Sequence, residues 1–192
     1  MLNKVKALTV LILFSAVALV SAEGYKPKAP KKGHVLVVGS VSYKKPIDIE
    51  ARREGFGANK NLQIGKTYEF SKKADFKNKV FDNVSEGVDG YFFQEIKVPK
   101  DGKLYLNHID VTLFGNINMW YQFRLPGGVS ISVPDEAVYV YIGNFEYDLD
   151  YALRTVGFRH LDDYEATKKY LSREIGEDID LYRAALDFDS KN

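Results

Sequence analysis

The chain has 192 residues, 45% of them hydrophobic, so it is long enough and apolar enough to fold around a core rather than remain disordered. It contains no cysteine, which excludes disulfide bonds, thiolate metal ligands and cysteine nucleophiles. Its 27 basic and 26 acidic side chains nearly balance, and without a concentrated basic surface no nucleic-acid partner is expected.

Residues 1–22 have the pattern of a signal peptide. Two lysines precede an apolar stretch at 7–20, and small residues follow it up to Ala22. The stretch is shorter than the roughly 20 residues that span a membrane, so we expect cleavage after Ala22, with an uncleaved anchor as the alternative. The protein is therefore expected to be exported, periplasmic or secreted, without a transmembrane span after cleavage. A flexible leader rich in Lys and Pro follows at 23–33.

Residues 34–160 are expected to form an antiparallel β-sandwich of the transthyretin or immunoglobulin kind. In the first part of this domain, alternating or continuous apolar patterns predict strands at 34–43, 67–70, 91–98 and 104–114. Between the last two, Pro99-Lys-Asp-Gly102 is a turn sequence, because Pro presets φ and Gly accepts a left-handed conformation. The sequence therefore predicts a hairpin here.

A second hairpin is predicted around Pro126-Gly127, between alternating segments at 119–125 and 129–133. The segment 138–147 follows and is apolar on both faces, which is typical of a central strand covered on both sides. On a period of two, Val140 would share one face with Ile142, and Tyr139 the other face with Tyr147. Gly143 interrupts the pattern and indicates a bulge or a close approach of a neighbouring element. The segment 152–158 is expected to pair with this strand in the antiparallel direction.

Residues 161–192 change period and predict a helical cap on the same domain. Asp162 and Glu165 have capping spacing at the start of a helix, and Gly176 is a suitable stop. A second short helix is predicted from about 178 to 188. The expected fold class is therefore mainly β, with two short C-terminal helices.

The segment 90–106 resembles the strand–turn–strand unit of carboxypeptidase regulatory-like, transthyretin-like modules. Its aromatic strand Tyr91-Phe-Phe runs into the Pro99–Gly102 turn and then into Leu104-Tyr-Leu. The opening strand with Gly39-Ser-Val41 is also similar to these modules. The resemblance covers residues 34–147 and implies a β-sandwich accessory or binding module without catalysis. It assigns no functional residue.

Three aromatic side chains are candidates for a binding surface: Trp120, Tyr139 and Tyr141. Flat rings can stack on sugars or on a protein partner, although rings at strand spacing also fill cores. Trp120 lies opposite the apolar face of its predicted strand, so it is the one most expected to contact a ligand.

Glu146, Asp148 and Asp150 would share one side of a continued strand and are candidate calcium ligands. Their spacing is not that of a calcium-binding loop, and acids at an exposed strand end are the alternative interpretation. The three histidines have no metal-ligand spacing, and His108, in mid-strand, is expected to hydrogen-bond beside the core. No cofactor is expected.

These features favour an exported, non-catalytic module that binds a protein or an envelope polymer. One alternative is a cell-wall or carbohydrate hydrolase that uses carboxylates, which would need a cleft and a carboxyl group with a shifted pKa. The other is a structural subunit of an envelope assembly. An exposed aromatic patch or an unpaired edge strand would support the binding role.

Overall fold

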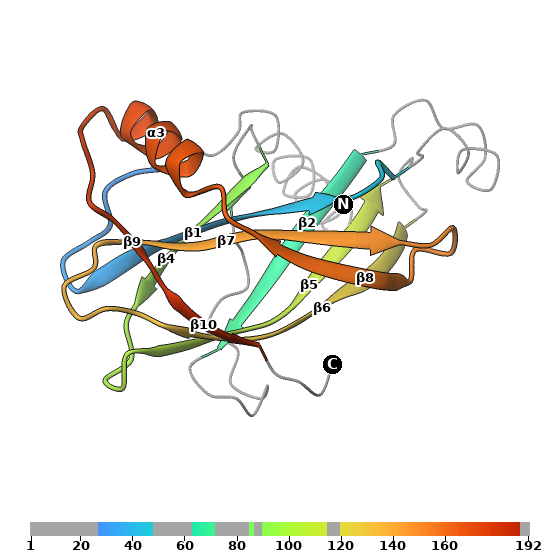
Figure 1. The fold of residues 1–192 in the computed structure, drawn as a ribbon, viewed down its shortest axis with the longest axis horizontal. Coiled ribbons are helices and arrows are strands. Elements are labelled where there is room, and N and C mark those ends of the chain that lie inside the picture. Colours follow the sequence, from blue (N-terminus) through green and yellow to red (C-terminus); the bar gives the residue numbers. More distant parts are fainter. Residues whose placement is uncertain (1–26, 48–62, 72–84, 87–89, 115–119, 189–192) are drawn as a thin grey trace, which may run out of the picture.

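The computed structural model describes residues 27–47, 63–71, 85–86, 90–114 and 120–188, which form ten strands and one helix (Figure 1). In chain order they are β1 (His34–Tyr43), β2 (Gln63–Ser71), β3 (Ser85–Glu86), β4 (Tyr91–Lys97), β5 (Lys103–Phe114), β6 (Trp120–Ser132), β7 (Tyr139–Leu149), β8 (Thr155–Leu161), α3 (Tyr164–Ile175), β9 (Leu181–Arg183) and β10 (Ala185–Phe188). The prediction of a mainly β protein is confirmed.

The strands form two sheets with a shared apolar core between them. Sheet A has the order β3-β4-β1-β7-β8, with β9 also paired to β7, and sheet B has the order β10-β6-β5-β2 (Figure 1). Val37 and Val140 of sheet A lie in one buried cluster with Tyr68, Ile109 and other side chains of sheet B. Burial of these facing surfaces supplies the main apolar contribution to folding.

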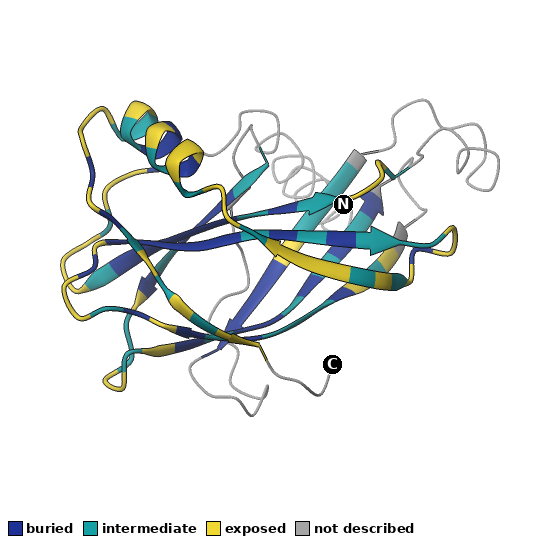
Figure 2. Ribbon diagram, viewed as in Figure 1, coloured by how far each residue is buried: buried dark blue, intermediate teal, exposed yellow. Residues whose placement is uncertain are grey.

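The helix α3 covers the other face of sheet A. Leu36 of β1 and Tyr141 of β7 belong to a second buried cluster with Tyr170 and Leu171 of α3. The centre of sheet A is therefore buried on both sides, and Figure 2 shows β1 and β7 buried along much of their length. This confirms the prediction that the segment around 138–147 is a central strand covered on both faces.

A β-bulge at Gly143 changes which residues of β7 face the core. The pairing of β7 with β1 shifts by one residue at this position. Side chains before and after the bulge therefore enter the same cluster: Val140, Ile142, Phe145 and Tyr147. The prediction placed Tyr147 on the face of Tyr139. That placement is wrong, because the extra residue reverses the alternation.

Gly143 is required at the bulge for two reasons. Its φ of +90° lies in the left-handed region that other residues rarely adopt. A Cβ atom there would lie 1.9 Å from Nε2 of His160, whose ring packs over the glycine from β8. The same Nε2 donates a hydrogen bond of 2.9 Å to the carbonyl oxygen of Ile142. Both expected roles of Gly143, a bulge and a close approach, are confirmed.

The prediction of a purely antiparallel fold is wrong for part of sheet A. β1 and β9 both run parallel to β7, whereas β4 pairs antiparallel with β1 and β8 pairs antiparallel with β7. Side-chain alternation reports how a strand is buried but not the direction of its neighbour. The double-sided burial of β1 and β7 is typical of parallel pairs.

The first predicted hairpin is also wrong, although its turn is present. The N–H of Gly102 donates a hydrogen bond of 3.0 Å to the carbonyl oxygen of Pro99. However, β4 pairs with β1 and β3, whereas β5 pairs with β2 and β6. The turn therefore carries the chain from sheet A to sheet B instead of joining neighbours within one sheet.

The second predicted hairpin is a single strand. β6 continues through Pro126, Gly127 and Gly128, opposite an irregularity in β5 at Asn107. A Cβ at Gly127 would lie 2.5 Å from the carbonyl oxygen of Asn107, so the glycine allows close contact between the two backbones. Turn-forming residues here accommodate a bulge without reversing the chain.

At the C-terminus, one of the two predicted helices is present. α3 ends before Gly176, whose φ of +85° is left-handed, as predicted. Its N-cap is Asp163 and not the predicted Asp162, and the Asp163 side chain makes no capping hydrogen bond, although Asp162 accepts one from the N–H of Tyr164. The predicted second helix is wrong, because this segment forms β9 and β10. Leu181 pairs beside β7 and Leu186 beside β6, so the available sheet edges override the local helical pattern.

Other predictions lie outside the described residues. The signal peptide at 1–22 and the first part of the leader at 23–33 are among these. Within the described ranges, no helix has the length and hydrophobicity needed to cross a membrane.

Gly143→Ala is expected to lower the free energy of unfolding by about 2–4 kcal/mol, because it combines an unfavourable φ with a steric clash. Gly33→Ala is the matched control, since Gly33 has a φ of +78° but no atom within 4 Å of the added Cβ. This control should cost about 1–2 kcal/mol. Urea denaturation measures both, and adding His160→Ala to Gly143→Ala should remove most of the difference. Equal losses in the two glycine variants would contradict the steric role of His160.

Candidate functional site

The three aromatic residues predicted to bind a ligand do not form one surface. Tyr139 and Tyr141 are only 6% and 4% exposed, and both lie in the cluster beneath α3. Trp120 begins β6, where its backbone pairs with Phe114, but its side chain lies outside the described part of the structure. The two tyrosines therefore belong to the interior, and the role of Trp120 stays a prediction.

The hydroxyl groups of these tyrosines hold the chain around α3. The oxygen of Tyr141 accepts a hydrogen bond of 2.5 Å from the N–H of Asp163, just before the helix. Burial raises the pKa of Tyr141 to about 12. Burial, followed by the nearby carboxylate of Glu177, also raises the pKa of Tyr139. Both rings are thus uncharged structural contacts at neutral pH.

The three predicted calcium ligands each have a cation of their own. Arg159 binds the carboxylate of Glu146 through Nε at 2.8 Å, Lys44 lies 2.6 Å from Asp148, and Arg154 lies 2.6 Å from Asp150. The described residues contain no group of three or more acidic, His or Cys side chains placed to hold a metal ion. The geometry therefore lends the calcium hypothesis no support.

These contacts also affect the carboxylate chemistry. The hydrogen bond from Lys44 lowers the pKa of Asp148, and hydrogen bonds from the backbone and side chain of Arg154 lower that of Asp150. Both side chains are thus ionised at neutral pH. A general acid in a glycosidase needs the opposite shift, so this pair does not provide one.

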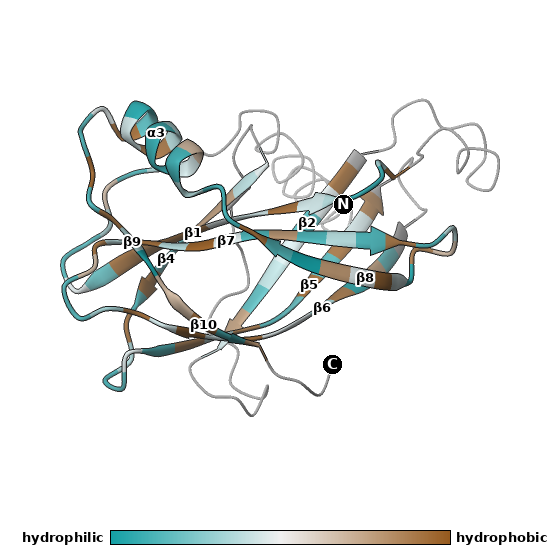
Figure 3. Ribbon diagram, viewed as in Figure 1, coloured by the Kyte–Doolittle hydropathy of each residue, from teal (hydrophilic) through white to brown (hydrophobic). Residues whose placement is uncertain are grey.

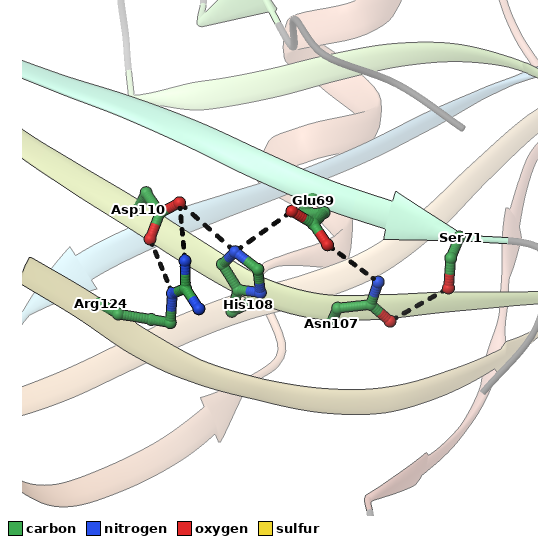
Figure 4. Close-up of polar contacts among 6 residues, drawn as sticks. All are labelled: Glu69, Ser71, Asn107, His108, Asp110 and Arg124. Atoms are coloured by element: carbon green, nitrogen blue, oxygen red, sulfur yellow. Dashed lines mark hydrogen bonds and ion pairs between the residues drawn. The ribbon is translucent and has the colours of Figure 1, made fainter. Parts of the chain in front are cut away.

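A network of polar side chains crosses the outer face of sheet B (Figure 4). Nε2 of His108 on β5 lies 3.3 Å from a carboxylate oxygen of Glu69 on β2 and 3.3 Å from one of Asp110. Arg124 on β6 donates from Nε to Asp110 at 2.8 Å. The network therefore joins three neighbouring strands, β2, β5 and β6, through contacts between their side chains.

The bulge at Asn107 extends this network along the sheet. Asn107 donates from Nδ2 to Glu69 at 3.5 Å, and its Oδ1 accepts a hydrogen bond of 3.1 Å from Ser71. Glu69, Ser71 and Asn107 are all buried. Polar groups with so little solvent need partners, so we interpret the network as a cross-strand contact that stabilises sheet B. His108 was predicted to hydrogen-bond beside the core. It lies half-buried beside two carboxylates, at 3.3 Å from each, but its Nε2 makes no hydrogen bond.

Among the described residues, three of the five exposed large hydrophobic side chains lie on β8 and β10. Val156 and Phe158 on β8 are 63% and 41% exposed, and Phe188 on β10 is 38% exposed. The rings of Phe158 and His160 lie 5.8 and 5.4 Å from the ring of Phe188. We call these four residues the β8–β10 rim. Figure 3 shows apolar residues on β8, and Figure 2 shows that none of this strand is fully buried.

Two residues of the β8–β10 rim contact the buried core directly. Phe158 packs against Tyr147, and His160 against Phe145, both of which are fully buried. β8 pairs with β7 on one side and has no strand on its other side among the described residues. The sequence identified β8 only as a partner of β7. The exposure of β8 could not be derived from the sequence, because it depends on which strand lies at the edge of sheet A.

Comparison of the chain with protein-family models, with curated proteins and with solved structures finds no match.

Glu69→Ala is expected to lower the free energy of unfolding by about 1–3 kcal/mol, because it removes the carboxylate that contacts both the buried Asn107 and the half-buried His108. Glu174→Ala is the control, since Glu174 pairs with the largely exposed Arg173 and should contribute less than about 1 kcal/mol. Urea denaturation of both variants checks the prediction. Equal losses would mean that the network stabilises the fold no more than a surface ion pair does.

The raised pKa of Tyr141 predicts a loss of stability in alkali. An unfolded tyrosine ionises near pH 10, whereas folded Tyr141 keeps its proton up to about pH 12. The folded state therefore binds more protons in this interval, and the free energy of unfolding falls as the pH rises through it. Melting temperatures measured from pH 9 to 12 should decline less steeply in Tyr141→Phe. An unchanged slope would contradict the assignment.

Proposed function

We propose that the protein is an exported, non-catalytic module that binds a protein partner through the β8–β10 rim. The observation that carries this proposal is an edge strand with exposed apolar side chains and one unpaired side. Such a strand offers a row of N–H and C=O groups to a further strand, together with apolar surface to bury.

β8 has only partial protection against pairing. Val156 lies at a bulge in the β7–β8 ladder, since Gly157 pairs with Asp148 while Thr155 pairs with Leu149. Bulges and charges commonly block edge strands. The remaining residues of β8 carry a single charged side chain, Arg159, which already binds Glu146 on the same sheet. Most of β8 therefore stays suitable for pairing.

The sequence supports the export component of this proposal. The signal-like pattern at 1–22 and the absence of cysteine suit a periplasmic or secreted location. The resemblance of 90–106 to transthyretin-like modules also implies a binding or accessory role. Both remain expectations from the sequence.

Two of the earlier alternatives are less well supported. The low pKa values of Asp148 and Asp150 disfavour these carboxylates as the acid of a hydrolase. An envelope polymer would need polar groups arranged around the aromatic rings, whereas the rim is mainly apolar. A structural subunit of an envelope assembly would also pair through the free edge of β8. That hypothesis differs from our proposal only in the identity of the bound partner.

A photo-crosslinking amino acid at position 156 tests the proposal in the full chain, expressed in its native cells. We expect a discrete protein adduct, and we expect Phe158→Ser to reduce its yield at least tenfold through loss of apolar contact. The control is the same crosslinker at position 138, because Val138 is also exposed, at 46%, but precedes β7.

Three results would contradict the proposal. These are the absence of an adduct at 156, equal adducts at 156 and 138, and an adduct of heterogeneous mass typical of a polymer. The last result would favour the envelope-polymer alternative.

A further inference from the structure

We propose that the partner at the β8–β10 rim is a second copy of this chain, joined by antiparallel pairing of β8 with β8. This inference rests on the proposed function and specifies its partner. Three features of β8 support it: its free backbone edge, the side chains that a two-fold axis would place together, and the charges at its two ends.

The backbone of β8 is available for such pairing. β8 contacts only β7 in the ladder of sheet A, and none of its residues is buried. β2, an edge of sheet B, differs because four residues at its end, Tyr68 to Ser71, are buried. Pairing two β8 strands would extend sheet A continuously through both copies.

A two-fold axis at Phe158 gives favourable side-chain pairs. Phe158 then faces its own symmetry mate, and both rings already border Phe188. Arg159 falls opposite Gly157, so the two arginines do not face each other. Val156 falls near His160, although the bulge at Val156 makes this pair less regular. Paired aromatic residues and separated like charges both stabilise antiparallel strands.

The ends of β8 have opposite charges. Arg154 precedes the strand and its side chain is 79% exposed, and Asp162 follows the strand and its side chain is 56% exposed. Antiparallel pairing brings the start of one β8 beside the end of the other. Arg154 of each copy therefore lies near Asp162 of its mate, at both ends of the interface. This charge complementarity distinguishes a second copy from an unrelated apolar strand.

Analytical ultracentrifugation of the purified protein over a range of concentrations tests the inference. We expect a monomer–dimer equilibrium that Phe158→Ser weakens at least tenfold, whereas Val138→Ser leaves it unchanged. Arg154→Asp alone and Asp162→Arg alone should each weaken the dimer, by about tenfold, because each places like charges at both ends of the interface.

Mixing the two charge variants gives the sharper test. In a heterodimer of Arg154→Asp with Asp162→Arg, opposite charges meet again at both ends, so dimerisation should recover in the equimolar mixture. Each reversal also disturbs a contact within its own chain, with Asp150 or with Arg183, but those disturbances are the same before and after mixing. Recovery therefore reports only the contact between copies.

The outcomes separate this inference from the proposed function. A protein that stays monomeric up to about 1 mM, or a dimer that survives Phe158→Ser, overturns the pairing of β8 with β8. Failure of dimerisation to recover in the equimolar mixture of the two charge variants also overturns this pairing. If position 156 still crosslinks to a different protein, the proposed function stands without this inference. If position 156 crosslinks to nothing, both are wrong.

Discussion

The fold depends on the burial of β7 from both sides. One face of this strand fills the core between the sheets and the other supports α3, so β7 connects the two buried clusters. The bulge at Gly143 allows this arrangement, because it turns Phe145 and Tyr147 toward the core after Tyr139 and Tyr141 have faced the helix. The ring of His160 occupies the space that the glycine leaves.

Much of the secondary structure could be predicted from residue patterns. The first strand, the central strand with its special glycine, and the helix ending at Gly176 were all evident, because each depends on local alternation or a local backbone requirement. The choice of pairing partner could not be predicted in this way. Pro126-Gly127 has turn chemistry, yet it lies within β6, because the fit of Gly127 against Asn107 is set by contacts between strands.

The candidate sites also depend on contacts between distant segments, which local patterns do not reveal. Tyr139 and Tyr141 were predicted to bind a ligand, but both are buried beneath α3, a helix that is distant in sequence. The network around Glu69, His108 and Arg124 draws its residues from three strands, so no spacing in the sequence reveals it. The rim of β8 and β10 likewise exists only because both strands lie at sheet edges. The order of the strands in the two sheets therefore decides where such an interaction surface lies.

The last two strands join the sheets directly. β9 pairs with β7 in sheet A and β10 pairs with β6 in sheet B, while Ala184 between them donates its N–H to the carbonyl oxygen of Tyr141. A link of one residue allows almost no sliding of one layer over the other. Separating the two sheets would therefore require breaking the pairing of β9 with β7 or of β10 with β6.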